Sequence, residues 1–272
     1  MLGRYKDYKP KDLGKLLERK LKMPWYWGVA HTCPACGTRL RRFKPIWKSF
    51  PRKLKEAGFI YPLESFETFN FEAFLCPSCN CSDRERLYAL YLRRWIASHQ
   101  SGARHVLVDF APSHALSSWL RTEATVHYRS ADLFRPNVDD KIDITNMPEY
   151  AQDSVDAFIC SHVLEHIPDD LSSMRELHRI LKPGGFGIIM VPLIQGVTET
   201  HEDPAISDPQ LRWRYFGQDD HVRLYGTSDF VRQLSSVGFH VDRLGMEHFG
   251  AESFRRAAIA DNSILYVVSK QR

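Results

Sequence analysis

Two pairs of cysteines stand near the start of the chain, each with two residues between its members. Cys33 and Cys36 lie in CPACG, and Cys76 and Cys79 lie in CPSC. A Cys-x-x-Cys pair on a tight turn presents both thiolates to one metal ion, and two such pairs supply the four tetrahedral ligands that Zn²⁺ prefers. The proline after the first cysteine of each pair favours such a turn. The spacing therefore predicts a structural zinc site.

Other interpretations of the cysteines stay open. The two pairs are separated by 39 residues, more than in most zinc ribbons, so the intervening segment must loop out or pack as a small subdomain. Cys81 follows the second pair and is an alternative to Cys79 as the fourth ligand. Redox chemistry is the competing function of a Cys-x-x-Cys pair, but no strand-then-helix pattern frames either pair.

Acidic residues follow two apolar runs in the second half of the chain. Residues 105–110 and 125–130 are predicted strands, with Asp109 in the end of the first and Asp132 just after the second. In doubly wound sheets ligands bind beyond the carboxyl ends of the strands, where an acid can accept hydrogen bonds from a ribose diol. No G-x-G follows Asp109, so the dinucleotide fingerprint is absent. A lone acid at a strand end is equally typical of a helix cap.

Three residues are candidates for a general base. His162 follows a predicted strand at 155–160, and Asp220 and His221 lie in a long insertion at about 194–225. A connection of this length is typical of a lid or a substrate-binding element, the alternative being a solvent-facing excursion.

The string HVLEH, from His162 to His166, also matches the inverted zinc-protease motif H-x-x-E-H. A protease would need one helical turn between the two histidines and a third ligand downstream. Here the string directly follows a predicted strand and leads to Pro168, which favours a strand-to-helix turn.

The elements that must position these residues alternate from residue 104 onward. Alternating strands and amphipathic helices indicate a parallel sheet with helices on both faces, which is the doubly wound α/β class. The predicted strands are 105–110, 125–130, 155–160, 186–191, 241–244 and 264–269, and the predicted helices are 115–121, 170–181 and 227–237.

A helix predicted at 84–99 ends at a polar, glycine-containing break. We therefore expect an N-terminal zinc-binding module at 1–100, ending in this linker helix, and a second domain at 101–272. A short basic helix is predicted at 12–22, with leucines on one face. Such a face could contact a membrane or nucleic acid, but it more often packs on its own protein.

Charge divides the chain in the same place. The net charge is +4 over 272 residues, but residues 1–100 carry 20 Lys and Arg against 9 Asp and Glu, and residues 101–272 carry 17 against 24. The composition excludes a mainly disordered, collagenous or coiled-coil chain. The basic half is either a solvated face or a surface for an anionic partner.

Neither a secretory signal nor a membrane span is predicted. Residues 1–23 are charged throughout and lack an apolar core segment, and the longest apolar run, near 187–194, is too short to cross a bilayer. We expect a cytoplasmic protein, where cysteine pairs bind metal rather than form disulfides.

The motifs of the second half resemble those of class I S-adenosylmethionine-dependent methyltransferases, over roughly residues 104–270. The most recognisable string is LKPGG at 181–185. More narrowly, the chain is similar to bacterial type 11-like methyltransferases with a zinc-ribbon-like module, through CPACG, CPSCNCSDRER, APSHAL, HVLEHI and FGQDDHVRLYG, in that order.

This resemblance implies a seven-stranded, Rossmann-like methyltransferase domain and a set of cofactor-binding residues. Asp109 matches the acid of the first motif, Asp132 the ribose ligand, and Asp143 with Ile144 the adenine-binding pair. The remaining positions that line the cofactor are Ala111, Ser113, Ser161 and His162. The chain departs from the family at Ala111-Pro112-Ser113, which replaces the glycine-rich loop.

The resemblance implies transfer of a methyl group from S-adenosylmethionine to a small-molecule or saccharide acceptor, on a hydroxyl group. One alternative is an RNA methyltransferase whose basic zinc module binds RNA. Against it, the chain has no NPPY-like motif and no cysteine nucleophile pair in its second half. The other alternative is a non-catalytic zinc-binding interaction protein on a methyltransferase scaffold, which the missing glycine loop suggests.

Overall fold

The structure is a computed structural model that describes residues 23–99, 102 and 104–271. The helix predicted at 12–22 lies outside the described residues. The helices are η1 (Met23–Trp25), α2 (Ser49–Glu56), η2 (Leu63–Ser65), α3 (Asp83–Ser98), α4 (His114–Leu120), η3 (Leu164–His166), α5 (Asp170–Ile180), α6 (Pro209–Phe216), α7 (Thr227–Ser236), α8 (Met246–Phe249) and α9 (Ala251–Ala257). The strands are β1 (Trp27–Thr32), β2 (Arg39–Leu40), β3 (His105–Phe110), β4 (Val126–Ala131), β5 (Val155–Ser161), β6 (Leu181–Met190), β7 (His201–Glu202), β8 (Arg223–Leu224), β9 (His240–Leu244) and β10 (Leu265–Ser269).

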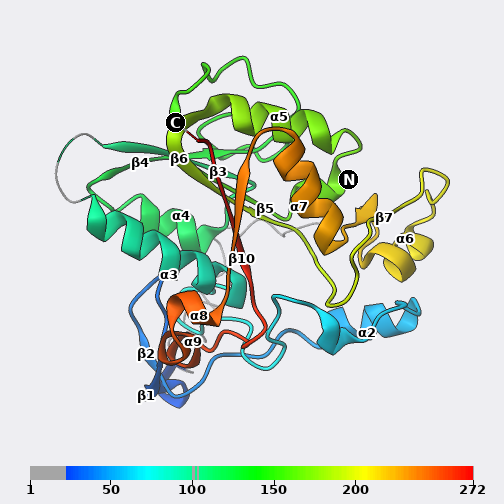
Figure 1. Ribbon diagram of the computed structural model, residues 1–272. Coiled ribbons are helices and arrows are strands. Elements are labelled where there is room, and N and C mark those ends of the chain that lie inside the picture. The colour runs from blue at the N-terminus through cyan, green and yellow to red at the C-terminus, as the bar shows by residue number, and fades with distance from the viewer. Residues whose placement is uncertain (1–22, 100–101, 103, 272) are drawn as a thin grey trace.

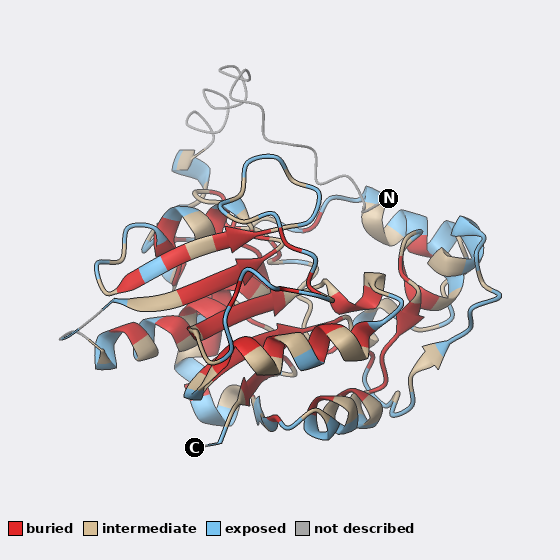
Figure 2. Ribbon diagram, turned by 90° about the horizontal axis from the view of Figure 1, so that it is seen from above, coloured by how far each residue is buried: buried red, intermediate tan, exposed pale blue. Residues whose placement is uncertain are grey.

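A mixed sheet of six strands forms the centre of the molecule, in the order β4-β3-β5-β6-β10-β9. β4, β3, β5 and β6 pair in parallel, and β10 runs antiparallel to both of its neighbours. β5 is an almost continuous run of buried residues, as expected for a parallel strand covered on both faces. Figure 2 shows that the central strands are mostly buried. The predicted doubly wound, Rossmann-like fold is confirmed.

Helices cover both faces of this sheet. In Figure 1, α5 and α7 lie on one side and α3 and α4 on the other. α3 begins with a capping box, in which Ser82 and Glu85 satisfy each other's backbone N–H groups. The rings of Tyr91 and Trp95 on α3 then pack edge-on against Phe186 of β6, with ring centroids 5.1 and 5.2 Å apart. The helix predicted at 84–99 therefore links the cysteine region to the sheet.

The described residues form six strands in the central sheet, where the sequence resemblance implies seven. At the outer edge of β4 a single parallel bridge joins Ala131 to Asp140. Asp140 also accepts hydrogen bonds from the guanidinium of Arg129, one of them 2.7 Å long. The segment before Asp140 contains Pro136, which has no backbone N–H to donate, and it has few apolar residues at alternate positions. It therefore lacks both the regular backbone hydrogen bonds and the buried face of a further strand.

The LKPGG string forms the first half of β6. β6 starts at Leu181, five residues before the predicted strand, and its register against β5 shifts between Leu181 and Phe186. Gly184 has a φ of 79°, a conformation that glycine adopts without strain. The glycines therefore allow a bulge in the strand.

The segment between the two cysteine pairs packs as a small aromatic unit against the insertion. Leu54 of α2, Phe66, Ile194, Phe216 of α6 and Leu224 form a buried group, which we call the aromatic cluster. The rings of further phenylalanines surround it. Two segments that are far apart in the sequence, 49–71 and 194–225, thus share one hydrophobic core.

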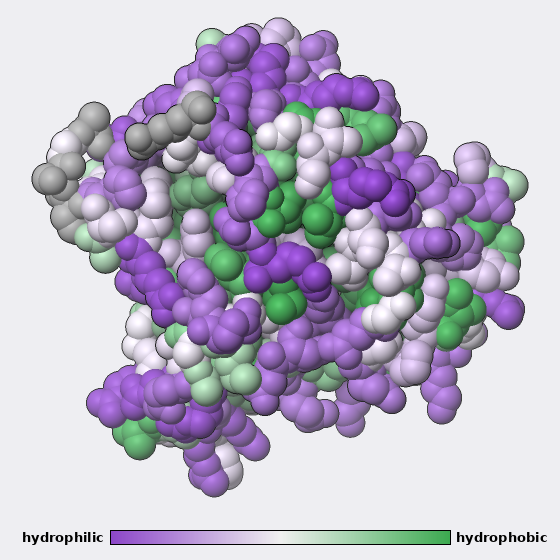
Figure 3. Space-filling model, viewed as in Figure 1, coloured by the Kyte–Doolittle hydropathy of each residue, from purple (hydrophilic) through white to green (hydrophobic). Residues whose placement is uncertain are grey.

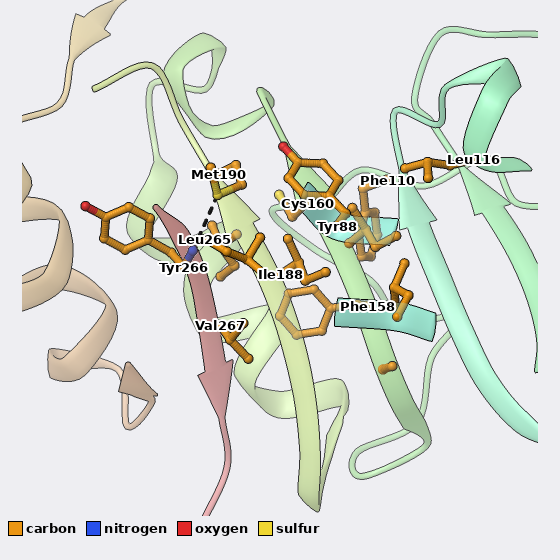
Figure 4. Packing of buried hydrophobic residues seen from close by; sticks show 14 of the residues in the cluster. Tyr88, Phe110, Leu116, Phe158, Cys160, Ile188, Met190, Leu265, Tyr266 and Val267 are labelled. Atoms are coloured by element: carbon orange, nitrogen blue, oxygen red, sulfur yellow. Dashed lines mark hydrogen bonds between the residues drawn. The ribbon is translucent and has the colours of Figure 1, made fainter. Parts of the chain in front are cut away.

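The main core extends from the cysteine region through the sheet to the C-terminal strands. Its members include Cys33, Leu87, Phe158 and Tyr266. Figure 4 shows neighbouring strands of this core, where the backbone N–H of Tyr266 donates to Met190 Sδ at 3.5 Å. A division into domains at residue 100 stays a prediction.

The surface is mainly polar. Figure 3 shows hydrophilic residues over most of one face, with hydrophobic residues gathered near its middle. Among the described residues, no helix combines the length and the apolar character needed to cross a membrane.

Candidate active site and metal-ligand clusters

The two cysteine pairs sit on turns of the same construction. The N–H of Gly37 donates to the carbonyl of Cys33 at 2.8 Å, and the N–H of Asn80 donates to the carbonyl of Cys76 at 2.9 Å. Gly37 and Asn80 both have positive φ, 71° and 63°. Each turn therefore curls back so that both of its sulfurs point the same way.

These turns bring four sulfur atoms within 4.8 Å of one another, those of Cys33, Cys36, Cys76 and Cys79. Two of the separations are 3.7 Å, from Cys33 to Cys79, and 3.9 Å, from Cys36 to Cys76. A tetrahedral zinc ion with bonds of about 2.3 Å separates its sulfurs by roughly 3.8 Å. The four side chains thus fit the predicted zinc module.

The ionisation of the four thiols is coupled. Hydrogen bonds from Cys36 and the other thiols lower the pKa of Cys33, whereas hydrogen bonding to Cys33 raises the pKa of Cys79. A bound dication lets all four ionise. Cys81 lies outside the group of four; its thiol is buried and donates to the carbonyl of Ser82 at 3.6 Å.

The loop after β3 adopts a glycine-like conformation without glycine. Ala111 has a φ of 53°, in the left-handed region where a Cβ costs about 1–2 kcal/mol. Its N–H donates to the carbonyl of Ala131 at 2.9 Å. Ser113 accepts from the N–H of Leu116 and caps α4. The backbone therefore makes the tight strand-to-helix turn that the close approach of a cofactor requires.

Asp109 and Asp132 lie on either side of this loop, at the carboxyl ends of β3 and β4. Burial raises the pKa of Asp109 to about 7, and the hydroxyl of Tyr128 donates to its carboxyl group at 2.8 Å. Asp132 accepts from two backbone N–H groups of its own turn, and its other oxygen lies 3.4 Å from Nε of Arg135. The guanidinium of Arg135 also donates to the carbonyl of Pro112, which ties the two loops together.

Of the other predicted cofactor residues, Asp143 and Ile144 lie between β4 and β5, and Ser161 is the last residue of β5. Asp143 accepts from the N–H and the hydroxyl of Thr145, and Ile144 is buried beside it. The hydroxyl groups of Ser161 and Tyr88 are 2.8 Å apart. Tyr88 comes from α3, a contact that sequence reasoning missed because the two residues are 73 positions apart. The cofactor-binding roles of these residues stay predictions.

His162, Asp220 and His221, the three candidates for a general base, gather around one buried carboxylate, Glu165. Nδ1 of His162 lies 3.2 Å from Glu165 Oε1, and Nε2 of His221 lies 3.9 Å from the same oxygen. Asp220 Oδ1 lies 3.4 Å from Nδ1 of His166. We call these five residues the Glu165 cluster. The sequence predicted its members separately, and only the fold unites β5, η3 and the insertion around Glu165.

Burial decides the charges in this cluster. Burial lowers the pKa of His162 to about 4 and also lowers the pKa of His221. Burial acts to raise the pKa of Glu165, but the neighbouring histidines outweigh it and bring the value to about 2. Burial also acts to lower the pKa of His166, but the neighbouring carboxylates of Asp220 and Glu165 outweigh it and raise that pKa. At neutral pH the Glu165 carboxylate therefore faces the neutral imidazoles of His162 and His221.

The arrangement does not match the inverted zinc-protease motif. His162 has a φ of 56°, and η3 begins only at Leu164. No helical turn therefore connects His162 to His166, as that motif requires.

Arg223 contacts the backbone on both sides of the turn that carries Glu165 and His166. Its side chain is almost fully buried and donates to the carbonyl groups of Leu164, Ile167 and Pro168 and to the carboxylate of Glu202. Arg223 therefore fixes the backbone around η3.

The sequence profile of a family described as "Methyltransferase domain" matches residues 69–244. No curated protein matches the chain.

Solved structures similar to this chain include three proteins of low identity. The YcgJ protein from Bacillus subtilis is 16% identical over 68% of this chain and 99% of that chain, with a TM-score of 0.44. A SAM-dependent methyltransferase from Archaeoglobus fulgidus is 13% identical over 69% and 93%, with a TM-score of 0.42. A Haemonchus contortus N-methyltransferase in complex with phosphomonomethylethanolamine and S-adenosylhomocysteine is 12% identical over 71% and 60%, with a TM-score of 0.41.

Proposed function

The chain belongs to the methyltransferase domain family, and we propose that it transfers the methyl group of S-adenosylmethionine to a hydroxyl group of a small-molecule or saccharide acceptor. The observation that carries the choice of a hydroxyl is the pair formed by His162 and Glu165 at the carboxyl end of β5. A hydroxyl must lose its proton as it is methylated, and an imidazole beside a carboxylate is suited to take it.

S-adenosylmethionine, when bound, supplies a methyl group on a positively charged sulfur, and transfer is an in-line displacement. The protein must hold the acceptor close and aligned, which supplies several kcal/mol by itself. Asp109, the Ala111 turn and Asp132 surround the place for the cofactor, and Ile144 offers an apolar surface to the adenine. The left-handed conformation of Ala111 supports this assignment, because strained residues of this kind cluster at ligand-binding sites.

His162 is the residue we assign to the proton. Its low pKa keeps the imidazole neutral at pH 7, and a neutral imidazole can accept a proton. Glu165 beside Nδ1 favours the tautomer with a proton on that atom, which leaves Nε2 for the acceptor. His221 is only 1% exposed, so we assign the base to His162 rather than to His221 or Asp220.

We also propose that Cys33, Cys36, Cys76 and Cys79 bind a structural zinc ion. The sulfur separations support it, and a site with four protein ligands leaves no position open for catalysis. On this proposal residues 1–100 are a zinc-containing module that supports the methyltransferase domain through α3.

A methyl-transfer experiment tests the acceptor. Purified full-length protein is incubated with S-adenosylmethionine labelled in its methyl group and with panels of saccharides and small hydroxyl compounds, and the product is identified by NMR. We expect an O-methyl ether. A product methylated on nitrogen or carbon would contradict the hydroxyl assignment without affecting the family.

Substitution of His162 tests the proposed proton transfer directly. We expect His162→Gln to lower kcat by about 100- to 1,000-fold, because the hydroxyl proton then has no acceptor. The affinity for S-adenosylhomocysteine, measured by isothermal titration, should change far less than kcat. His240→Gln, at an exposed histidine on β9, is the matched control. Equal kcat in the wild type and His162→Gln would remove the base from the proposal.

RNA is the second candidate acceptor, and one observation favours it. Trp25, Trp27 and Trp47 are exposed large side chains in the basic half of the chain, and Arg41 lies beside the first two. Exposed aromatic rings among basic residues are typical of single-stranded nucleic-acid surfaces. A gel-shift series with single-stranded and structured RNA would then show binding that weakens steeply with salt. No binding at low salt excludes RNA.

A further inference from the structure

The Glu165 cluster contains the ligand atoms of a second metal site, distinct from the four cysteines. One ligand atom each from Glu165, His166 and His221 lie within 4.8 Å of one another. Glu165 and His166 belong to η3, and His221 follows α6 in the insertion. The fold therefore brings two imidazoles and a carboxylate to one point from two separate segments.

The orientation of His221 is fixed by the backbone. Its Nδ1 lies 2.9 Å from the carbonyl oxygen of Phe216. A carbonyl only accepts hydrogen bonds, so Nδ1 carries the proton, and Nε2 of the neutral ring presents a lone pair. Histidines that bind metals are commonly held in this way, with the other ring N–H donated to a carbonyl group.

The lone pair on His221 faces a carboxylate. Nε2 lies 3.9 Å from Glu165 Oε1, and Glu165 is 0% exposed. Nε2 of His221 lacks a hydrogen-bond partner among the described residues, and the contact of Glu165 Oε1 with Nδ1 of His162, at 3.2 Å, does not have hydrogen-bond geometry. If the ring were an imidazolium instead, its Nε2–H would still be too distant for a hydrogen bond.

Two buried acceptors that face each other are costly unless something positive lies between them. Leaving a buried polar group without a partner costs about 1–3 kcal/mol, and more for a charged group. The ring of His166 adds a third possible ligand on the same side. A cation bound between these groups would satisfy Glu165 and His221 together.

We propose that Glu165, His166 and His221 bind a divalent transition-metal ion such as Zn²⁺. Two imidazole nitrogens and one carboxylate oxygen form a ligand set that suits zinc and its neighbours better than Ca²⁺ or Mg²⁺. Bonds of about 2.0–2.2 Å place tetrahedral ligands roughly 3.4 Å apart, so small side-chain rotations bring the ligand atoms from 3.9 Å into range. Asp220, 3.4 Å from His166, lies where it can orient that ring.

The ion would fasten the insertion to the catalytic end of β5. His221 belongs to the insertion, whereas Glu165 and His166 follow directly from His162 on the strand-to-helix turn. The metal site thus connects the turn that carries the proposed base to the proposed acceptor-binding segment. Binding of the metal does not depend on which molecule is methylated.

Metal analysis of the full-length protein, purified without chelators, tests this site. We expect two equivalents of metal per chain in the wild type. Cys76→Ser should lose the equivalent bound by the cysteines, and His221→Gln or Glu165→Gln should lose the other. His178→Gln, at a partly buried histidine on α5 outside the cluster, is the control and should keep both.

Cobalt separates the two sites in the wild type, independently of whether any variant folds. Co²⁺ bound by thiolates gives intense near-ultraviolet charge-transfer absorption, and Co²⁺ bound by nitrogen and oxygen gives only weak visible bands. We expect a second equivalent of Co²⁺ to bind without increasing the thiolate absorption. A wild-type protein that takes up a single equivalent, with thiolate absorption alone, overturns the proposal. So does a second equivalent that both His221→Gln and Glu165→Gln retain.

Discussion

At the scale of single residues, Asp109 illustrates how position changes chemistry. Asp109 lies near the carboxyl end of β3 and is 3% exposed, and its carboxyl group accepts a hydrogen bond from Tyr128. Burial raises its pKa from 3.8 to about 7, because the charged form has lost its water. A carboxyl group with a raised pKa favours the folded state while it is protonated. Its contribution is fully present below pH 3.8 and is lost as the pH rises through about 7.

Asp109→Asn should remove this pH dependence from the ligand-free protein, because the amide stays neutral. We expect the Tm of the variant, relative to wild type, to rise by roughly 4–8 °C between pH 5.5 and pH 8, corresponding to about 2 kcal/mol. Thermal denaturation at both pH values measures it. The exposed Asp261→Asn is the control, and its difference from wild type should be the same at both values. A constant difference for Asp109→Asn as well would mean that Asp109 ionises normally in the fold.

At the scale of elements, Arg86 joins three segments that the sequence keeps apart. It lies on α3, is 0% exposed, and stacks on the ring of Phe43 with its guanidinium carbon 3.9 Å from the centroid. Its guanidinium donates to the carbonyl groups of Phe74 and Cys81 near the second cysteine pair, and to those of Ala257 and Ala258 at the end of α9. The Arg86 side chain thus supplies hydrogen-bond donors both to the segment around the second cysteine pair and to the end of α9.

Arg86→Met should lower the free energy of unfolding by about 3–5 kcal/mol, because several buried carbonyl groups would lose their donor together. Chemical denaturation of the zinc-loaded protein measures the loss. Arg52→Met is the control, since Arg52 lies on α2 with its side chain 71% exposed, and it should change the free energy by less than about 0.5 kcal/mol. Similar values for the two variants would contradict the role of Arg86.

At the scale of the whole molecule, the aromatic cluster connects the N-terminal region to the insertion. Leu54 and Phe66 come from the segment between the cysteine pairs, and Ile194, Phe216 and Leu224 come from the insertion. Phe216 also supplies the carbonyl group that orients His221. The packing of the N-terminal region therefore reaches the Glu165 cluster through one residue.

Leu54→Ala tests this connection. Leu54 is fully buried, so we expect the cavity to cost about 2–5 kcal/mol of stability and to expose the insertion to proteases earlier than the rest of the chain. Limited proteolysis followed by mass spectrometry locates the first cleavage. Ile60→Ala, at an exposed side chain in the same segment, should leave both stability and the cleavage pattern unchanged. First cleavage of Leu54→Ala outside residues 194–225 would argue against the connection.

The sequence predicted the elements well where periodicity is strong. The strand predicted at 105–110 is β3, and the helices predicted at 170–181 and 227–237 match α5 and α7 to within one residue at each end. These elements combine regular apolar spacing with clear ends, which are local properties. The start of β6 was missed because a bulge at two glycines keeps LKPGG in the strand, and the implied seventh strand is reduced to the bridge at Asp140.

The sequence by itself determined the family, the alternation of strands and helices, and the two cysteine turns, because each of these is written in residues close together in the chain. Only the tertiary structure determined which of these parts contact one another. It buried Glu165 beside His162, oriented the ring of His221 through the carbonyl of Phe216, and joined α3 to α9 through Arg86. Glu165 and His221 are separated by α5, β6 and most of the insertion, and no local pattern encodes their distance. Their meeting follows from the packing of the sheet and the aromatic cluster, which places the ends of both segments at one edge.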